Sequence, residues 1–120
     1  MMSKKIMIFD DDHDILEVTS LILSKRHYKV KAVNDLHDFL DKILKFQPNV
    51  ILMDIRIPEL GGKEATRIIK KTMRTKNIPV ILFTAHNKGK DDLINMTGAQ
   101  DVLFKPFNIK TLVRKIEAVM

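Results

Sequence analysis

Five short apolar segments alternate with helical stripes along this chain, and this alternation limits the possible folds more than any other feature. The segments are KIMIF (5–9), YKVKAV (28–33), NVILMD (49–54), PVILFT (79–84) and DVLF (101–104). Each has the length of a β-strand, is rich in Val, Ile and Phe, and is bounded by polar or turn residues. Strict alternation of strands and helices predicts a parallel sheet with helices on both faces.

Five helices are expected, one after each strand. Four of them are predicted from apolar residues at helical spacing, and the fourth helix is weakly patterned within residues 88–99, with glycine at both ends. Polar residues that can cap a helix precede the second and the fifth. The marking residues are Ile15, Val18, Leu21 and Ile22; Leu36, Phe39, Leu40, Ile43 and Leu44, capped by Asn34 or Asp35; Ala65, Ile68, Ile69 and Met73; and Ile109, Leu112, Val113, Ile116 and Met120, capped by Asn108.

Length and composition predict one globular domain over residues 1–120. The chain has 120 residues, of which 45% are hydrophobic, so it can bury a substantial core but not two. It has no cysteine, which excludes disulfides and thiolate sites. No segment approaches the roughly 18 apolar residues of a membrane helix, and the N-terminal apolar stretch is too short for a signal peptide. We therefore expect a soluble, cytoplasmic protein, with no output domain after the fifth helix.

The strand order can be inferred from the patterns of the strands themselves. The second strand alternates apolar residues with Lys29 and Lys31, so it belongs at a sheet edge, whereas the third and fourth are apolar throughout and belong at the centre. The order 2-1-3-4-5 satisfies both conditions. Ligands of such sheets bind beyond the carboxyl ends of the strands.

In that order, five side chains converge at the carboxyl ends of four neighbouring strands. They are Asp10, Asp11, Asp54, Thr84 and Lys105. Three carboxylates suit a hard divalent cation such as Mg²⁺, which prefers oxygen ligands. A hydroxyl and an ammonium beside them would bind phosphoryl oxygens, and one carboxylate could be the nucleophile that forms an aspartyl phosphate.

At these positions the sequence resembles the response-regulator receiver domain of two-component signalling. The resemblance is carried by IFDDDHDI (8–15), MDIRIPELGG (53–62), ILFTA (81–85) and FKPF (104–107), in order and over the whole chain. It implies a flavodoxin-like doubly wound fold. It also implies that Asp54 accepts a phosphoryl group from a histidine kinase or a histidine phosphotransfer protein, and that the chain works as a phosphorylation switch rather than as a conventional enzyme.

The resemblance also assigns the ligands of the metal ion. Asp11 and Asp54 would be direct Mg²⁺ ligands, and Asp10 would act largely through metal-bound water. The backbone carbonyl of Arg56 would supply a further protein ligand. Mg²⁺ is the only cofactor that the resemblance implies.

Other residues would contact the phosphoryl group by the same resemblance. Thr84 would be the switch hydroxyl, and Ala85 the small residue that leaves room for the group. Lys105 would contact the phosphate, aimed into the site by a cis Lys105–Pro106 bond.

The sequence departs from the family pattern at Val102, where the family often has Tyr or Phe. Valine has no aromatic ring that could turn inward on phosphorylation. We therefore expect a smaller rearrangement of this surface, or one carried by the fourth helix. Arg56 and His86 lie two residues after Asp54 and Thr84 and border the path of attacking water. Either they are exposed loop residues or they set the lifetime of the phosphoryl group.

Two rival interpretations of the acidic cluster fail on the sequence. A haloacid-dehalogenase-like phosphatase would use Asp10 as nucleophile and Asp12 as acid, but Asp14 stands where that family has Thr or Val. A calcium loop would need glycine at Ile15 and glutamate at Leu21. We instead expect Asp12 and Asp14 to begin the first helix, where negative charge is favourable.

Most of the net charge of +6 comes from one basic run. The simpler interpretation is that this run is the solvated face of the third helix. The alternative is that it docks to an acidic partner. Nucleic-acid binding is a minor possibility, because no aromatic residues are interleaved. Other expected partners are an unidentified downstream protein and a second copy, paired through the fourth helix, fifth strand and fifth helix. The run consists of Lys63, Arg67, Lys70, Lys71, Arg74 and Lys76, against the single anion Glu64.

Overall fold

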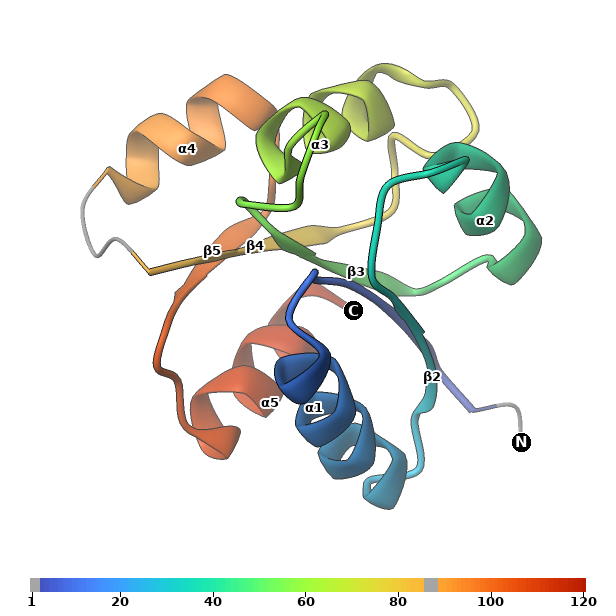
Figure 1. Ribbon diagram of the computed structural model, residues 1–120, viewed down its shortest axis with the longest axis vertical. Helices are drawn as coiled ribbons and strands as arrows, with labels where there is room; N and C mark the ends of the chain where they lie inside the picture. The colour runs from blue at the N-terminus through green and yellow to red at the C-terminus, as the bar shows by residue number, and fades with distance from the viewer. Residues whose placement is uncertain (1–2, 86–88) are drawn as a thin grey trace.

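The sheet at the centre of the computed structural model is parallel throughout and has the order β2-β1-β3-β4-β5 (Figure 1). The structure describes residues 3–85 and 89–120. The predicted strand order is therefore confirmed, and each predicted strand is found within one residue of its expected start. The strands are β1 (Lys5–Phe9), β2 (Lys29–Val33), β3 (Val50–Asp54), β4 (Val80–Thr84) and β5 (Asp101–Phe104).

Five helices cover the two faces of this sheet. In Figure 1, α2, α3 and α4 lie on one side and α1 and α5 on the other. This is the flavodoxin-like arrangement expected from the sequence. The helices are α1 (His13–Lys25), α2 (Phe39–Phe46), α3 (Gly62–Lys71), α4 (Lys90–Thr97) and α5 (Ile109–Val119).

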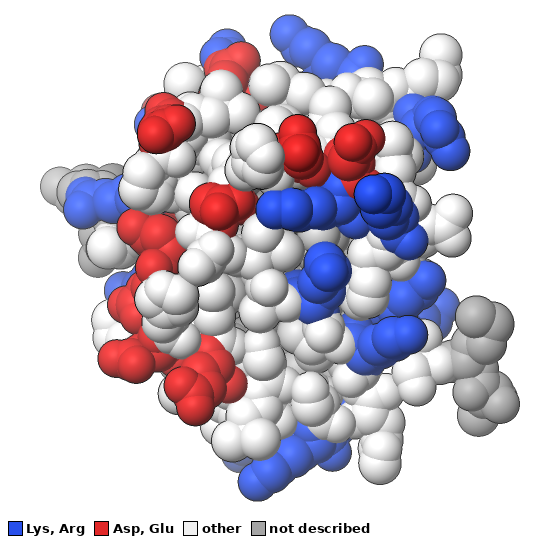
Figure 2. Space-filling model, turned by 45° about the vertical axis from the view of Figure 1, so that its right-hand side comes forward, with Lys and Arg blue, Asp and Glu red and all other residues white. Residues whose placement is uncertain are grey.

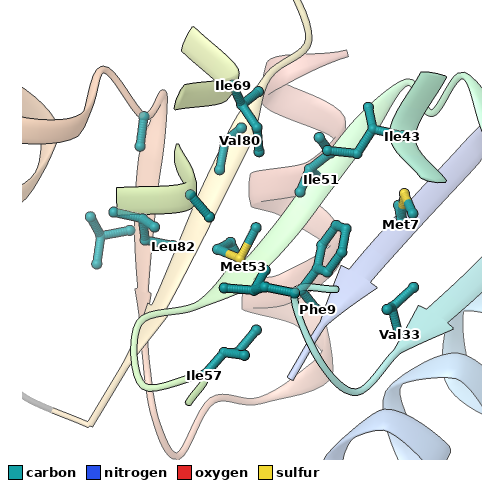
Figure 3. Packing of buried hydrophobic residues seen from close by; sticks show 14 of the residues in the cluster. Met7, Phe9, Val33, Ile43, Ile51, Met53, Ile57, Ile69, Val80 and Leu82 are labelled. Atoms are coloured by element: carbon teal, nitrogen blue, oxygen red, sulfur yellow. The ribbon is translucent and has the colours of Figure 1, made fainter. Parts of the chain in front are cut away.

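The core consists of two apolar layers, one on each face of the sheet. Alternate residues of one strand enter opposite layers, because successive side chains of a strand point to opposite faces. Met7 and Phe9 pack with Ile43 of α2 and Ile69 of α3 (Figure 3). Ile6 and Ile8 belong to the other layer, with α1 and α5.

The burial of each strand agrees with its place in the sheet. Every residue of β3 and β4 is buried, as expected of central strands. In the edge strand β2, Lys29 and Lys31 are exposed, and such charges discourage edge-to-edge association. Figure 2 looks toward the α2 and β2 side and shows most of the acidic side chains along the left of that face, with Lys and Arg side chains scattered over its centre and right.

The buried face of α1 differs from the predicted one. Val18 and Leu21 are each 56% exposed, and the buried residues are Leu16, Thr19 and Leu23. With about 3.6 residues per turn, Val18 and Leu21 project far from the side that carries Leu16 and Leu23. Both sides carry apolar residues, so apolar periodicity alone does not select between them. The structure turns the stripe of Leu16 and Leu23 toward the sheet, and Ile15 of the predicted stripe stays half-buried at its margin.

The predicted start of α2 is also wrong. Neither Asn34 nor Asp35 caps the helix, which begins at Phe39. The Asp35 carboxylate instead accepts the backbone N–H of His37 at 3.0 Å, which forms a turn before the helix.

The end of α3 corrects one further expectation. The helix stops at Lys71, so Met73 lies beyond it and is 76% exposed instead of packing in the core.

The caps of the last two helices agree with prediction. Gly89 and Gly98 flank α4 in the left-handed conformation, and the Asn108 side chain accepts the N–H of Thr111 at 2.7 Å.

The turn from β3 into α3 packs against the backbone of Asp54. The N–H of Gly62 donates to the carbonyl of Ile55 at 2.9 Å. A Cβ atom at Gly62 would overlap the carbonyl oxygen of Asp54, which is fixed in the central strand β3. Glycine is therefore required at position 62 for steric reasons.

We predict that Gly62→Ala lowers the free energy of unfolding by about 1–3 kcal/mol, because the added methyl group forces the turn away from β3. Urea unfolding followed by circular dichroism measures this. Lys63→Ala, one position along the same helix and exposed, is the control and should change stability by less than about 0.5 kcal/mol. Equal stability of Gly62→Ala and the wild type would contradict the packing described here.

Candidate functional site

The acidic cluster at the end of β1 divides into two parts with different surroundings. Asp10 is fully buried directly after the strand, whereas Asp11 is exposed. Asp12 is the N-cap of α1, and its carboxylate accepts the N–H groups of Asp14 and Ile15 at 2.9 and 3.3 Å. The prediction that Asp12 and Asp14 begin the first helix is confirmed.

Three carboxylates come together at the carboxyl edge of the sheet. Asp54 is the last residue of β3, and its side chain is 8% exposed. Oxygens of Asp10, Asp11 and Asp54 all lie within 4.8 Å of one another. β1 and β3 are neighbours in the sheet, so their carboxyl ends place these side chains together. An all-oxygen set of this kind is chemically suited to Mg²⁺.

A lysine bridges the two buried carboxylates. Lys105 Nζ lies 3.1 Å from Asp10 Oδ2 and 3.3 Å from Asp54 Oδ1, and the lysine side chain is 20% exposed. It reaches the site from the loop after β5, where the Lys105–Pro106 peptide bond is cis, as the resemblance implies. Asp10 Oδ1 also accepts the N–H of Asp12 at 3.0 Å.

The remaining predicted residues lie around this centre. Thr84 is buried at the end of β4, and its carbonyl accepts the N–H of Lys105 at 2.7 Å. Ala85 follows and is exposed, as is Arg56 two residues after Asp54. That the Arg56 carbonyl is a metal ligand stays a prediction.

Val102 and His86 are also predicted to modulate the switch, and for both this stays a prediction. Val102 is fully buried in the apolar layer under α3 and α4. His86 lies outside the described residues.

The sequence comparison decides the family. The profile described as "Response regulator receiver domain" matches residues 6–117. The chain belongs to this family. Among curated relatives, the receiver is 33% identical over 117 residues to the CAI-1 autoinducer sensor kinase/phosphatase CqsS of Vibrio cholerae, covering 96% of this chain and 17% of that protein. It is 29% identical over 120 residues to the phosphate regulon transcriptional regulatory protein PhoB of Klebsiella pneumoniae, covering 99% of this chain and 52% of that protein.

The receiver therefore spans about half or less of the length of these curated relatives.

Solved structures agree with the fold over nearly the whole chain. The chemotaxis protein CheY4 of Vibrio cholerae matches with a TM-score of 0.91 and 27% identity, covering 99% of this chain and 100% of that one. The receiver domain of the sensor histidine kinase PA1611 from Pseudomonas aeruginosa, solved with a magnesium ion in its active site cleft, matches with a TM-score of 0.87 and 28% identity, covering 98% and 97%.

No helix within the described parts of the receiver is long and apolar enough to cross a membrane.

Sequence reasoning missed the aromatic support of Lys105. Its ammonium lies 5.8 Å from the ring centroid of Phe83, and that ring packs on Phe107 at a centroid distance of 5.2 Å. Cation–π attraction of this kind adds to the ion pairs in holding the lysine. The signal was present in the sequence, since Phe83 precedes Thr84 in the fourth strand and Phe107 closes the FKPF motif.

Sequence reasoning also missed an ion cluster that joins three elements. Asp101, the first residue of β5, accepts from Lys90 of α4 at 3.1 Å and from Lys115 of α5 at 3.0 Å. Burial alone would raise the pKa of Asp101, but hydrogen bonds from Lys115, the Val102 N–H and Lys90 outweigh it and lower the pKa. No local motif predicts the cluster, because its members are widely spaced in the sequence.

Burial raises the pKa of Asp10 above its ordinary value of 3.8, and the nearby charge of Asp54 adds to this, against the bonds from Asp12 and Lys105. The folded state therefore holds a proton more tightly than the unfolded state. The stability that this provides is complete below pH 3.8 and is lost as the pH rises through the raised pKa of the folded protein. At neutral pH, without metal, the ionised carboxylate costs stability.

We predict that Asp10→Asn raises the free energy of unfolding at pH 7 without Mg²⁺ by on the order of 1 kcal/mol, because it removes a buried charge that repels Asp54. Asn keeps an oxygen to accept the Asp12 N–H. The variant should also lose the decline in stability as the pH rises above about 4. Urea unfolding over a pH series measures both effects.

Asp14→Asn is the matched control, because Asp14 is exposed in the first turn of α1, and it should lower stability by about 0.5 kcal/mol or less. Added Mg²⁺ should stabilise the wild type and the control more than Asp10→Asn. A destabilised Asp10→Asn variant would show that the Lys105 pair outweighs the burial cost.

Proposed function

We propose that this receiver takes a phosphoryl group onto Asp54 from a histidine kinase or a histidine phosphotransfer protein, and that the modified domain acts as a switch in a two-component phosphorelay. One observation carries the proposal: the Lys105 ammonium bridges Asp10 and Asp54 within a cluster of three carboxylates. Family membership and the kinase relatives support it.

In the transfer, an Asp54 carboxylate oxygen attacks phosphorus and a new O–P bond forms. The P–N bond of phosphohistidine breaks, and its electron pair returns to the imidazole nitrogen. Charge spreads over the phosphoryl oxygens as this happens. Lys105 already contacts Asp54 at 3.3 Å, so its ammonium can pair with an oxygen of the arriving group without a large movement.

The donor set fits Mg²⁺. Asp11, Asp54 and the Arg56 carbonyl would hold the ion directly, and Asp10 would hold it through water. When bound, Mg²⁺ supplies positive charge to phosphoryl oxygens. Thr84, buried at the end of β4, would donate its hydroxyl to another oxygen of the group, beside the small side chain of Ala85.

The domain modifies itself and then hydrolyses the acyl phosphate slowly, so we do not propose a conventional enzyme. Its downstream partner is proposed to be a protein that distinguishes the two states. Pairing of two copies through α4, β5 and α5 and the cytoplasmic location stay predictions.

Incubation with acetyl phosphate and Mg²⁺ should add one phosphoryl group to the intact protein, measured by mass spectrometry. The carboxylate of Asp54 attacks phosphorus, and acetate leaves with the electron pair of the broken bond. Asp54→Ala and addition of a chelator should each abolish the mass shift. Asp14→Ala should retain it, because that carboxylate belongs to the start of α1.

Folding of Asp54→Ala is checked by circular dichroism. An unmodified wild-type protein with its fold intact would refute the proposed function, and so would an unchanged mass shift in Asp54→Ala.

We predict that Arg56→Ala and His86→Ala change the dephosphorylation rate several-fold while changing stability by less than about 0.5 kcal/mol. The reason is that the sequence predicts both positions, two residues after Asp54 and Thr84, to border the path of attacking water, and Arg56 is exposed. Decay of ³²P-labelled protein after removal of the donor gives the rate. Glu17→Ala, exposed on α1, is the control. Unaltered decay in both variants would remove the idea.

A further inference from the structure

A groove between α3 and α4 is not used by the proposed phosphoryl transfer. These two helices lie side by side in Figure 1. Two hollows between them, of about 330 and 420 Å³, share Ile55, Lys63 and Met96 as lining residues. The first extends to Leu60, and the second extends to Thr84. Together they form one groove that begins beside the phosphoacceptor site.

The walls of the groove expose large apolar side chains. Leu60 is 42% exposed and Met96 is 51% exposed, and the two lie at the same hollow. Ile55 lines both hollows and Leu93 lines the second, and both are more buried. A single exposed apolar residue needs no explanation, but two that border a hollow with an apolar lining are typical of a binding surface.

The α3 wall of the groove carries a cation without a partner in the described part of the chain. Lys63 is exposed and makes no ion pair with any described residue. The nearby Glu64 is already paired with Arg67 at 3.1 Å, so it does not neutralise Lys63. Arg67 also donates to the carbonyl of Met96 at 3.0 Å, which braces α3 against α4.

Another cation of the basic run points elsewhere. Lys70 is half-buried and donates to the carbonyls of Ile78 at 2.6 Å and Lys76 at 3.1 Å, and burial lowers its pKa to about 8. Interpretation of the whole run as a solvated face is therefore wrong for Lys70, which fixes the loop between α3 and β4. Within the basic run, Lys63 lines both hollows of the groove, whereas Arg67 lines one of them and is already paired with Glu64.

We propose that this groove binds a protein segment that carries carboxylates beside a large apolar side chain. The apolar side chain would sit between Leu60 and Met96, and a carboxylate would pair with Lys63. Asp92 and Arg56 line the same hollow as Thr84 and have opposite charges, whereas Lys63 lines both hollows, so the acidic part of the segment would lie toward Lys63.

The groove is connected to Asp54 through the backbone. Ile55 follows Asp54 directly, and its carbonyl accepts the N–H of Gly62, the residue before Lys63. Gly62 packs so closely on the Asp54 carbonyl that no side chain fits there. A shift of the Asp54 backbone should therefore also move Gly62 and the groove wall that begins at Lys63. Binding in the groove and phosphorylation of Asp54 should therefore change each other's free energy. This coupling rests on the proposed function, whereas binding itself does not.

The test uses a phage-displayed library of random 12-residue peptides, selected against the receiver loaded with Mg²⁺ and beryllofluoride, an unreactive phosphoryl mimic. The selected sequences should combine Asp or Glu with Leu, Phe or Met. In fluorescence anisotropy, Lys63→Glu and Met96→Ser should each weaken binding of the best peptide tenfold or more. Lys45→Glu, exposed on α2, is the matched charge control and should stay within twofold.

The side chains of Lys63 and Met96 are exposed, so both variants should fold, and thermal unfolding checks this. A selection that yields no peptide dependent on Lys63 and Met96 overturns the proposal. The proposal is also overturned if a short DNA duplex binds at Lys63 and no peptide does.

Coupling is measured by omitting beryllofluoride, which should change the peptide affinity at least fivefold in the wild type and not in Asp54→Ala. An unchanged wild-type affinity refutes the coupling. If the peptide binds but acetyl phosphate does not modify the receiver, the proposed function is refuted and the groove proposal is still supported.

Discussion

The bridge from Lys105 to Asp10 and Asp54 is the interaction on which the rest of the site depends. Asp10 and Asp54 are buried carboxylates at the ends of two paired strands, and their charges repel each other. The ammonium at 3.1 and 3.3 Å offsets part of this repulsion. With Asp11 included, the centre keeps a net charge of about −2, which matches a divalent cation. The apo site is therefore arranged at a cost in stability.

The β3–α3 turn connects this centre to the surface. Its first residue follows Asp54, the proposed phosphoacceptor. Its glycine packs on the Asp54 carbonyl, and its far end begins the wall of the α3–α4 groove. A change of charge at Asp54 therefore acts on a backbone with little freedom to absorb it. The ion cluster of Asp101 joins α4 and α5 to β5. Movement of α4 away from β5 would stretch or break the Lys90–Asp101 pair.

The sequence predicted the strands, their order and the convergence of the site, because buried parallel strands are continuous apolar runs and their carboxyl ends share one edge. It predicted the wrong buried side of α1, because Leu16 and Val18 are two residues apart and project to nearly opposite sides of the helix, and both sides carry apolar residues. The inward role of Lys70 and the partners of Asp101 were also missed. Such contacts join residues that periodicity treats as surface, and only the three-dimensional packing reveals them.

The central claim is that the carboxylates of Asp10, Asp11 and Asp54 form a metal-binding phosphoacceptor centre completed by Lys105. A crystal structure with Mn²⁺ and beryllofluoride, using anomalous scattering, tests it most directly. The account predicts one manganese peak with Asp11, Asp54 and the Arg56 carbonyl as ligands, and beryllofluoride on Asp54 in contact with Lys105. Manganese elsewhere, or an Asp54 carboxylate that carries no beryllofluoride, would contradict it.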